Sequence, residues 1–215
     1  MNLAAIRQEY MRAGFSEAMA APSPITQFEA WFGDALKAGL PLPNAMTLAT
    51  VTPEGAPDAR IVLLKGIEAG AFVFYTNYAS RKGRELDATG AACLVFFWAE
   101  LERQVRIEGR VEKVAPEASD AYFATRPLGA RLSAWASPQS EPVADRATLE
   151  RRLEEAKARF AGRPPRPPHW GGYRVVPHAI EFWQGRADRL HDRLRYARAS
   201  EREPAGEWVL ERLAP

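Results

Sequence analysis

The fold is decided by residues 91–114, AACLVFFWAELERQVRIEGRVEKV, in which two β-rich runs lie on either side of a short polar break. The first run, 91–98, is almost entirely apolar and rich in aromatic residues, which is typical of a buried strand. In the second run, 103–114, apolar side chains such as Val105 and Ile107 alternate with polar ones. Alternation with a period of two predicts a strand with one buried and one polar face.

Similar short runs occur on both sides of this pair. They are separated by turns that contain glycine or proline, a pattern that predicts antiparallel hairpins. The further predicted strands are 47–51, 60–65, 72–75, 173–176, 179–183, 194–197 and 208–212.

Helical patterns gather in two blocks. In the first, residues 4–12 have helical composition and 25–37 carry apolar side chains at helical spacing, which predicts a helix that faces the core. The second block begins at Pro116 and ends in the charged stretch 149–160, which predicts an exposed helix without a functional role. Four prolines in 162–168 predict a stiff connector after it.

Strands joined by hairpins, with helices in blocks rather than alternating with the strands, favour a mainly β protein with added helices. The expected architecture is an antiparallel barrel of Greek-key type. With 215 residues, 47% of them apolar, we expect a single domain over 1–215. Its parts are a helical N-terminal segment at 1–40, a helical insertion at 116–162 and C-terminal strands at 170–215.

Composition argues against several classes of function. The 29 basic and 27 acidic side chains leave a formal charge of only +2, which argues against a nucleic-acid partner. One cysteine and three scattered histidines predict no metal site and no disulfide framework. We expect a cytoplasmic protein without a membrane partner, because no signal peptide or membrane-spanning stretch is visible. No Gly-x-Gly-x-x-Gly or Gly-Lys-Ser/Thr motif indicates a dinucleotide or nucleoside triphosphate site.

Positive charge is concentrated at a few points instead. Arg60 and Lys65 end the apolar run RIVLLK and would lie on opposite faces of an unbroken strand, so solvated strand ends are the simplest interpretation. Further on, Ser80, Arg81 and Lys82 open a short helix, whose free N–H groups and dipole suit a phosphate. The alternative is that Ser80 only caps the helix and both cations face water.

A third group pairs Tyr122 with Arg126 at i,i+4 spacing on a predicted helix. Together the two side chains could hold one phosphate or carboxylate; alternatively, the arginine packs on the tyrosine ring. The chain thus offers more Arg and Lys anchors than one phosphate needs. This surplus favours two phosphate-bearing aromatic ligands in one polar groove.

The sharpest functional signal is the sequence RLHDR at 189–193. In an extended chain Arg189, His191 and Arg193 share one face, which concentrates two fixed charges and one titratable group. His169 and His178 lie alone near prolines and are interpreted as structural.

Taken together, these motifs resemble the pyridoxamine 5'-phosphate oxidase family. The resemblance covers nearly the whole chain, from 7–10 to 212–215, and it depends on the shared order and spacing of the motifs. The motifs that carry it are RIVLLK at 60–65, FYTN at 74–77, SRK at 80–82, ERQV at 102–105, YF at 122–123 with RP at 126–127, Trp135 with QS at 139–140, WGG at 170–172, EFWQG at 181–185 and RLHDR at 189–193.

The resemblance implies a fold, a cofactor and a reaction. The family fold is an FMN-binding split barrel, which works as a homodimer with the flavin in a groove between subunits. The implied reaction oxidises pyridoxamine 5'-phosphate and pyridoxine 5'-phosphate, with O2 as the acceptor and hydrogen peroxide as a product, to give pyridoxal 5'-phosphate. Its redox chemistry belongs to the flavin, while the protein supplies position and electrostatics.

The matching positions imply the site residues. The implied FMN contacts are Arg60, Ile61, Val62, Leu63, Leu64, Lys65, Tyr75, Thr76, Arg81, Lys82, Gln104, Gln139, Ser140, Trp183 and Arg193. The implied substrate contacts are Arg7, Tyr10, Lys65, Tyr122, Arg126, Arg189 and His191, of which Arg189 and His191 are also the expected catalytic pair.

The sequence departs from the family pattern at one position. The family usually carries a serine that touches the substrate phosphate, and that position is Ala130 here. Loss of a hydroxyl weakens phosphate binding by about 1 kcal/mol unless a neighbour such as Arg131 or Ser133 replaces it. Two alternatives stay open: another split-barrel flavoprotein that acts on haem or another reductant, and a protein that binds pyridoxal phosphate or flavin without turnover.

Overall fold

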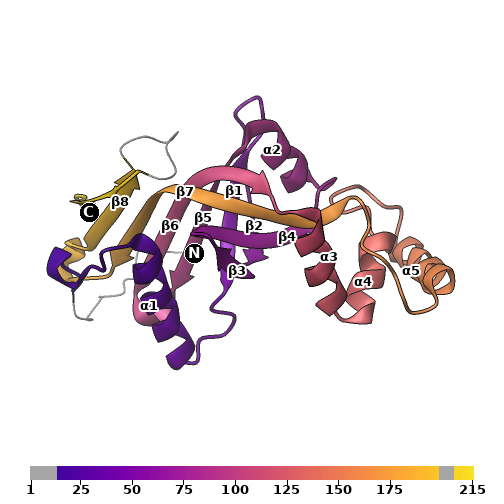
Figure 1. The fold of residues 1–215 in the computed structure, drawn as a ribbon, viewed down its shortest axis with the longest axis horizontal. Helices are drawn as coiled ribbons and strands as arrows, with labels where there is room; N and C mark the ends of the chain where they lie inside the picture. Colours follow the sequence, from indigo (N-terminus) through magenta and orange to yellow (C-terminus); the bar gives the residue numbers. More distant parts are fainter. Residues whose placement is uncertain (1–13, 199–205) are drawn as a thin grey trace, which may run out of the picture.

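The computed structural model describes residues 14–198 and 206–215, so the predicted helix at 4–12, with Arg7 and Tyr10, lies outside the described residues. The described part is built on a nine-stranded sheet in which every pair is antiparallel (Figure 1). Its strands are β1 (Ala45–Val51), β2 (Pro57–Leu63), β3 (Gly66–Glu68), β4 (Ala71–Asn77), β5 (Ala91–Trp98), β6 (Arg103–Lys113), β7 (Trp170–Gln184), β8 (Asp192–Arg198) and β9 (Trp208–Arg212). The predicted mainly β fold with added helices is confirmed.

Strand order shows how the sheet is divided. The main path is β2-β1-β5-β6-β7-β4-β3, while β8 pairs with β7 and β9 with β8. One edge of β7 is shared by two strands, because β4 pairs with its first half and β8 with its second half. The sheet also curls, so that β2 contacts β4 although the two are not hydrogen-bonded neighbours.

The prediction of separate strands at 173–176 and 179–183 was wrong, because β7 is continuous through Pro177. Proline has no N–H to donate and normally interrupts a central strand. Here Pro177 lies where β4 gives way to β8 and opposite a register shift of β6 between Glu108 and Gly109. A bulge leaves the ladder incomplete at this point, so the strand tolerates the missing donor.

The core lies between the inner face of the sheet and helix α1 (Pro24–Lys37). Phe28 and Trp31 of α1 are 1% and 4% exposed, as the apolar spacing of 25–37 predicted. The ring of Phe28 lies 5.0 Å from that of Phe96, and the ring of Trp31 lies 5.2 Å from that of Phe182. Burial of such side chains contributes about 1.5–3 kcal/mol each and fixes α1 against the sheet.

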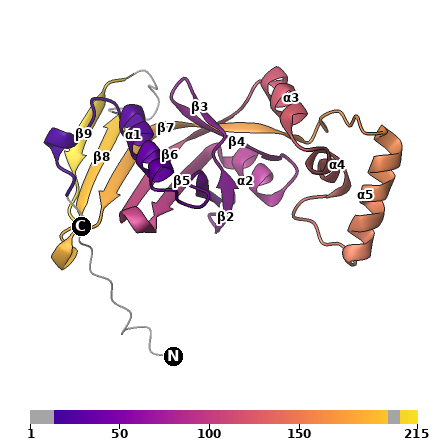
Figure 2. The ribbon, with the colours of Figure 1, turned by 90° about the horizontal axis from the view of Figure 1, so that it is seen from below.

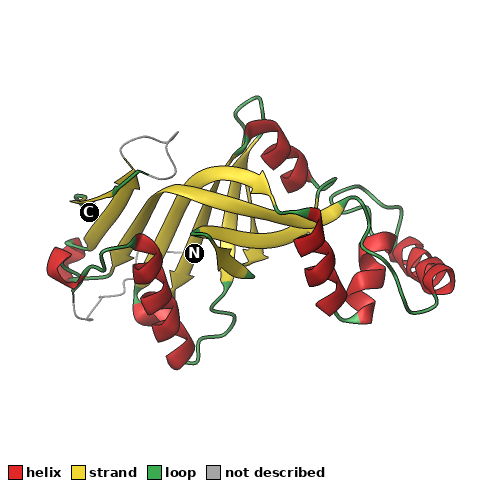
Figure 3. Cartoon of the chain, in the orientation of Figure 1, coloured by secondary structure: helices red, strands yellow, loops and turns green. Residues whose placement is uncertain are grey.

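The other helices lie at the far end and top of the sheet (Figures 2 and 3). Helix α2 (Arg81–Thr89) follows β4, and the predicted insertion consists of α3 (Pro116–Thr125), α4 (Leu128–Ala136) and α5 (Arg146–Phe160). Figure 1 shows β7 running from this helical end to the end formed by β8 and β9. In the described ranges, no helix is long and apolar enough to cross a membrane.

Gly109 provides a direct test of the bulge. A Cβ built on Gly109 would lie 2.3 Å from the backbone oxygen of Val176, which the strand pairing holds in place. We expect Gly109→Ala to lower the free energy of unfolding by about 2 kcal/mol, measured by urea denaturation. The control is Gly129→Ala on α4, where no atom lies within 4 Å of the new Cβ. That variant should be neutral or up to about 1 kcal/mol more stable, and equal behaviour of both variants would contradict the account.

Candidate active site

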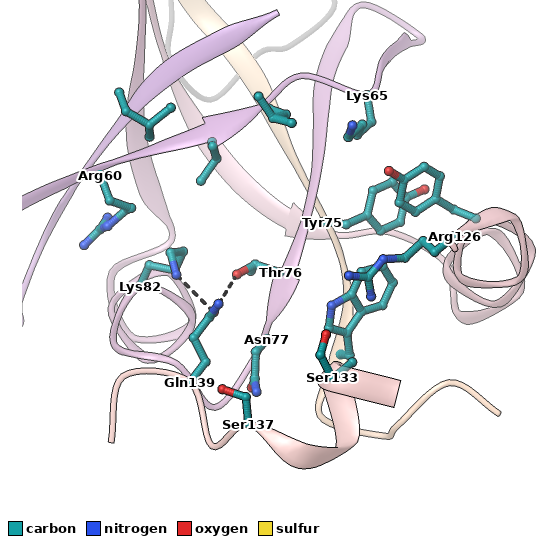
Figure 4. A pocket seen from close by; sticks show the side chains of 16 residues that line it. Arg60, Lys65, Tyr75, Thr76, Asn77, Lys82, Arg126, Ser133, Ser137 and Gln139 are labelled. Carbon is teal, nitrogen blue, oxygen red and sulfur yellow. Dashed lines mark hydrogen bonds between the residues drawn. The ribbon is translucent and has the colours of Figure 1, made fainter. Parts of the chain in front are cut away.

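A cavity of about 590 Å³ opens where the curled sheet brings β2 and β4 together, between the start of α2 and the helices α3 and α4 (Figure 4). Its volume lies within the range of ordinary cofactor and substrate sites. Most of the predicted site residues of the first half of the chain lie here. The lining consists of Arg60, Ile61, Val62, Leu63, Lys65, Tyr75, Thr76, Asn77, Lys82, Tyr122, Arg126, Ser133, Ala134, Ser137, Gln139 and Trp170.

Arg60 and Lys65 both line this cavity because the strand that carries them is broken. β2 ends at Leu63, and the N–H of Lys65 donates to the carbonyl of Val73 at 2.8 Å. The chain therefore leaves β2 before Lys65, and the alternation that would place the two cations on opposite faces does not reach it. Leu64, between them, is buried and lines a neighbouring cavity instead.

One end of the cavity carries a network of opposite charges. The Arg60 guanidinium donates to Asp58 at 2.5 Å, to Glu85 at 3.0 Å and to the hydroxyl of Thr50 at 2.6 Å. Arg81 Nε lies 2.9 Å from Glu85 and 3.1 Å from Asp58. Burial alone would raise the pKa of Glu85, but the hydrogen bonds from Thr50 and both arginines outweigh it and lower that pKa.

Lys82 lies beside this network. Ser80 caps helix α2, since its hydroxyl oxygen accepts from the N–H of Gly83, so Lys82 is in the first turn as the sequence predicted. Its ammonium group donates to Gln139 at 3.1 Å, and Gln139 also contacts Thr76 (Figure 4). Burial is the main cause that lowers the pKa of Lys82, and the positive charge of Arg60 lowers it further. Both effects are expected where buried cations outnumber the anions beside them.

The opposite end of the cavity is aromatic. The rings of Tyr75 and Tyr122 stack at 3.9 Å, and Tyr75 also stacks with Trp170 at 5.5 Å. The Arg126 guanidinium lies 4.5 Å from the Trp170 ring centroid, and burial lowers the pKa of Arg126. Its Nη1 is buried and has no hydrogen-bond partner in the part of the chain that is described. A desolvated cation with an unused donor suits an anionic ligand.

The predicted helical pairing of Tyr122 with Arg126 needs a correction. α3 ends at Thr125, and Arg126 is extended, with φ −70° and ψ 145°. The cause is Pro127, because a residue that precedes proline avoids the helical conformation. Both side chains still line the same cavity.

A second cluster of predicted residues lies at the other end of β7. Gln104 pairs in register with Trp183, and Trp183 pairs with Arg193. The ring of His191 lies 4.6 Å from that of Trp183, and its Nδ1 accepts from the N–H of Arg186 at 3.1 Å. This hydrogen bond favours the imidazole tautomer that carries its proton on Nε2.

The extended conformation predicted for 189–193 was wrong at Arg189, whereas Asp192 and Arg193 belong to β8. Ala187–Arg189 form a short 3-10 turn, in which Asp188 and Arg189 have φ of 56° and 60°. Arg189 therefore does not continue the strand face of His191 and Arg193. Alternation alone could not reveal a left-handed turn between two strands, because it assumes an unbroken strand.

The two clusters are far apart within one chain. Trp170 lines the cavity at the start of β7, and Trp183 lies thirteen residues further along the same strand. At about 3.3 Å per residue this separation is on the order of 40 Å. The cavity and the second cluster thus cannot contact one small ligand inside a single chain.

The remaining predicted residues and several unpredicted ones complete the site. Arg81 lies beside the cavity in the charge network, and Ser140 follows Gln139 with φ 74°. Sequence reasoning assigned no contact to Asn77, Ala134, Ser137, Trp170, Asp58 and Glu85, and it named Ser133 only as one of two replacements for the hydroxyl missing at Ala130. The i,i+4 spacings of Arg81 with Glu85 and of Ser133 with Ser137 were the available signals.

Comparisons with known proteins agree with this architecture. Residues 32–160 match the family model described as pyridoxamine 5'-phosphate oxidase, and residues 170–215 match the pyridoxine 5'-phosphate oxidase C-terminal dimerisation region. Relatives named pyridoxine/pyridoxamine 5'-phosphate oxidase from Burkholderia multivorans and Cupriavidus necator are 59% and 57% identical over 214 residues, which cover 100% of this chain and 99% of each relative.

Two solved structures are also similar. PhzG from Burkholderia lata 383, in complex with tetrahydrophenazine-1-carboxylic acid, has a TM-score of 0.84 and 34% identity, and the match covers 91% of this chain and 94% of that one. A pyridoxamine 5'-phosphate oxidase-related, FMN binding protein from Nostoc punctiforme has a TM-score of 0.70, covering 91% and 100%; at 18% identity it is evidence for the fold alone.

The fold is the FMN-binding split barrel. The chain belongs to the pyridoxamine 5'-phosphate oxidase family and carries that family's C-terminal dimerisation region. The residues present suit FMN: the cationic end of the cavity can hold a phosphate, and β2 and Tyr75 offer a partly apolar wall for a ring system.

Glu85 allows a test of the charge network by pH. Its pKa is lowered in the folded protein, so its ionisation stabilises the fold above its ordinary pKa of 4.5, and this contribution is lost as pH falls below that value. We expect Glu85→Gln to lower the free energy of unfolding by about 2 kcal/mol at pH 7, with the difference from wild type shrinking below pH 4.5. Denaturant unfolding of the flavin-free protein at several pH values measures this.

The matched control is Glu141→Gln, because Glu141 forms an exposed ion pair with Arg84 at 2.9 Å. That change should cost about 0.5 kcal/mol or less at any pH. A Glu85→Gln effect that stays constant from pH 7 to pH 3 would contradict the network described here.

Proposed function

We propose that this protein oxidises pyridoxine 5'-phosphate and pyridoxamine 5'-phosphate to pyridoxal 5'-phosphate, with FMN as cofactor and O2 as acceptor. The observation that carries the proposal is one cavity with two cationic ends, Arg60 with Lys82 at one and Lys65 with Arg126 at the other (Figure 4). A flavin phosphate and a substrate phosphate together account for both ends, whereas the flavin alone accounts for one. The names of the relatives at 57–59% identity support the same reaction.

The flavin phosphate is assigned to the charge network. Arg60, Arg81 and Lys82 supply the positive charge there, and Gln139 bridges Lys82 and Thr76. Asp58 and Glu85 fix the two guanidinium groups, which gives a preorganised seat. The other proposed FMN contacts in this half are Ile61, Val62, Leu63, Lys65, Tyr75 and Ser140, whereas Leu64 lines the neighbouring cavity.

The substrate phosphate is assigned to the aromatic end. Arg126 offers the unused Nη1 donor, while Tyr122 and Lys65 line the same wall. Trp170 backs the guanidinium at 4.5 Å and limits its movement. Arg7 and Tyr10, predicted to contact the substrate, lie outside the described residues.

A second copy of the chain completes the proposed site. Phe97 is 59% exposed and pairs in register with Gln104, so an exposed aromatic side chain lies beside the second cluster on the same sheet face. The homodimer proposed here covers Phe97 and brings Gln104, Trp183 and Arg193 of one chain to the cavity of the other. Strands β7 to β9, which carry most of this cluster, lie in the dimerisation region.

Arg189 and His191 are proposed to orient the substrate carbon that is oxidised, together with its amine or hydroxyl substituent. The redox chemistry would come from bound FMN, which would take up a hydride from the substrate carbon and return two electrons to O2 as H2O2. The alcohol substrate loses one further proton, and the amine substrate takes up water and releases ammonia. His191, with its Nδ1 engaged by the N–H of Arg186, presents Nε2 as the hydrogen-bonding atom toward the substrate, and Arg189 supplies a fixed charge.

The strongest rival is oxidation of a different ring system. PhzG is 34% identical to this chain, and its structure holds tetrahydrophenazine-1-carboxylic acid. Arg126 would suit that carboxylate as well as a phosphate. The substrates therefore have to be compared directly.

The first experiment loads the purified protein with FMN in air-saturated buffer. We expect pyridoxine 5'-phosphate to give equal amounts of pyridoxal 5'-phosphate and H2O2, and pyridoxamine 5'-phosphate to give ammonia as well. Tetrahydrophenazine-1-carboxylic acid should be oxidised far more slowly. Its faster oxidation would favour the PhzG-like rival, and bound flavin without turnover of any substrate would favour a non-catalytic binding protein or another split-barrel flavoprotein.

Variants at 189 and 191 test the assigned roles. Arg189→Ala with His191→Ala should lower kcat about 100-fold or more, since positioned proton-transfer and charged groups commonly contribute that much. Arg151→Ala, at an exposed arginine of α5, is the control and should leave kcat unchanged. Unchanged turnover in the double variant would overturn the assignment of both residues.

A further inference from the structure

The aromatic end of the cavity contains a buried hydrogen-bond donor that is not used within the described residues. Arg126 Nη1 is buried without a hydrogen-bond partner among the described residues. Its guanidinium lies 4.5 Å from the ring centroid of Trp170 and 5.5 Å from that of Phe123. Such a group binds an oxyanion most tightly when a second donor approaches the same anion from another element.

Helix α4 supplies candidates for that second donor. Ser133 lies on its cavity side, and Ser137 follows directly after its last residue; both line the cavity. Figure 4 shows that they serve different ends: Ser133 lies beside Arg126, whereas Ser137 lies beside Asn77 and Gln139. Of these two serines, only Ser133 is therefore placed to bind the same anion as Arg126.

The other residues on this part of α4 do not provide a donor. Ala130 has no polar side chain, and Arg131 is absent from the cavity lining although its Nε is buried without a partner. The Ser133 hydroxyl is exposed and donates to the carbonyl of Ala130 at 3.1 Å. A hydroxyl rotates about one bond, so it can exchange this local acceptor for a ligand oxygen at little cost.

We propose that the Ser133 hydroxyl binds the phosphate of the B6 substrate together with Arg126 Nη1. This inference rests on the proposed function for the identity of the ligand, and on the cavity geometry for the residue. The hydroxyl donates one charge-assisted hydrogen bond to a phosphate oxygen, and the guanidinium donates to another. Ser133 thereby supplies the hydroxyl that the family usually carries at the position of Ala130, about one turn earlier on the same helix face.

The test measures binding to the FMN-loaded protein by titration calorimetry, because the flavin phosphate seat is then filled. Ser133→Ala should weaken pyridoxal 5'-phosphate and inorganic phosphate about fivefold to tenfold, the effect of one hydrogen bond to a charged group. Pyridoxal, which lacks the phosphate, should bind equally to both proteins. In turnover, KM should rise by a similar factor with kcat nearly unchanged.

Thr125→Ala is the matched control, since Thr125 is exposed, donates to the carbonyl of Tyr122 three residues earlier as Ser133 does to Ala130, and is absent from the cavity lining. It should change affinity for pyridoxal 5'-phosphate less than twofold. Equal affinities of the Ser133 and Thr125 variants in an active oxidase would overturn the Ser133 inference and leave the proposed function standing. An inactive wild-type protein whose phosphate binding still depends on Ser133 would overturn the function and support the residue.

Discussion

The structure depends on one strand, β7, and on the backbone pairing along both of its edges. β6 pairs with it over nearly its whole length, while β4 and β8 divide the other edge between them. Pro177 and the shifted register opposite Gly109 mark the point of division. Because β4 and β8 diverge from this point, the cavity forms at one end of β7 and the cluster around Trp183 at the other.

The two ends of the cavity differ in how their charges are arranged. At one end, Asp58 and Glu85 balance much of the charge of Arg60 and Arg81 and hold both groups in place. At the other end, Arg126 has aromatic neighbours and an unused donor. The first arrangement suits a resident cofactor, because it exists before the ligand binds; the second suits a substrate that enters and leaves.

Local patterns predicted the regular elements well and the irregular ones poorly. The run 91–98 became β5 without a change of bounds, because its side chains favour a strand and its ends are set by turns. The continuity of β7 through Pro177 and the turn at Asp188 and Arg189 were not predicted, since both depend on which strands lie alongside. Most of the cavity residues were placed by resemblance to a family. Ser133 was named from the sequence beside Arg131, and the cavity lining separates the two; Glu85 emerged only when helix α2 was set against the sheet.

The central claim is that each active site combines the cavity of one chain with the second cluster of its partner. Subunit complementation tests it most directly, with Arg126→Ala in one chain and Arg189→Ala plus His191→Ala in the other, assembled together and assayed with pyridoxine 5'-phosphate. Random assortment should restore roughly a quarter of the wild-type sites, because half of the dimers are mixed and each mixed dimer has one intact site of two. Activity no greater than that of the separate variants would place both residue sets in one chain and contradict the account.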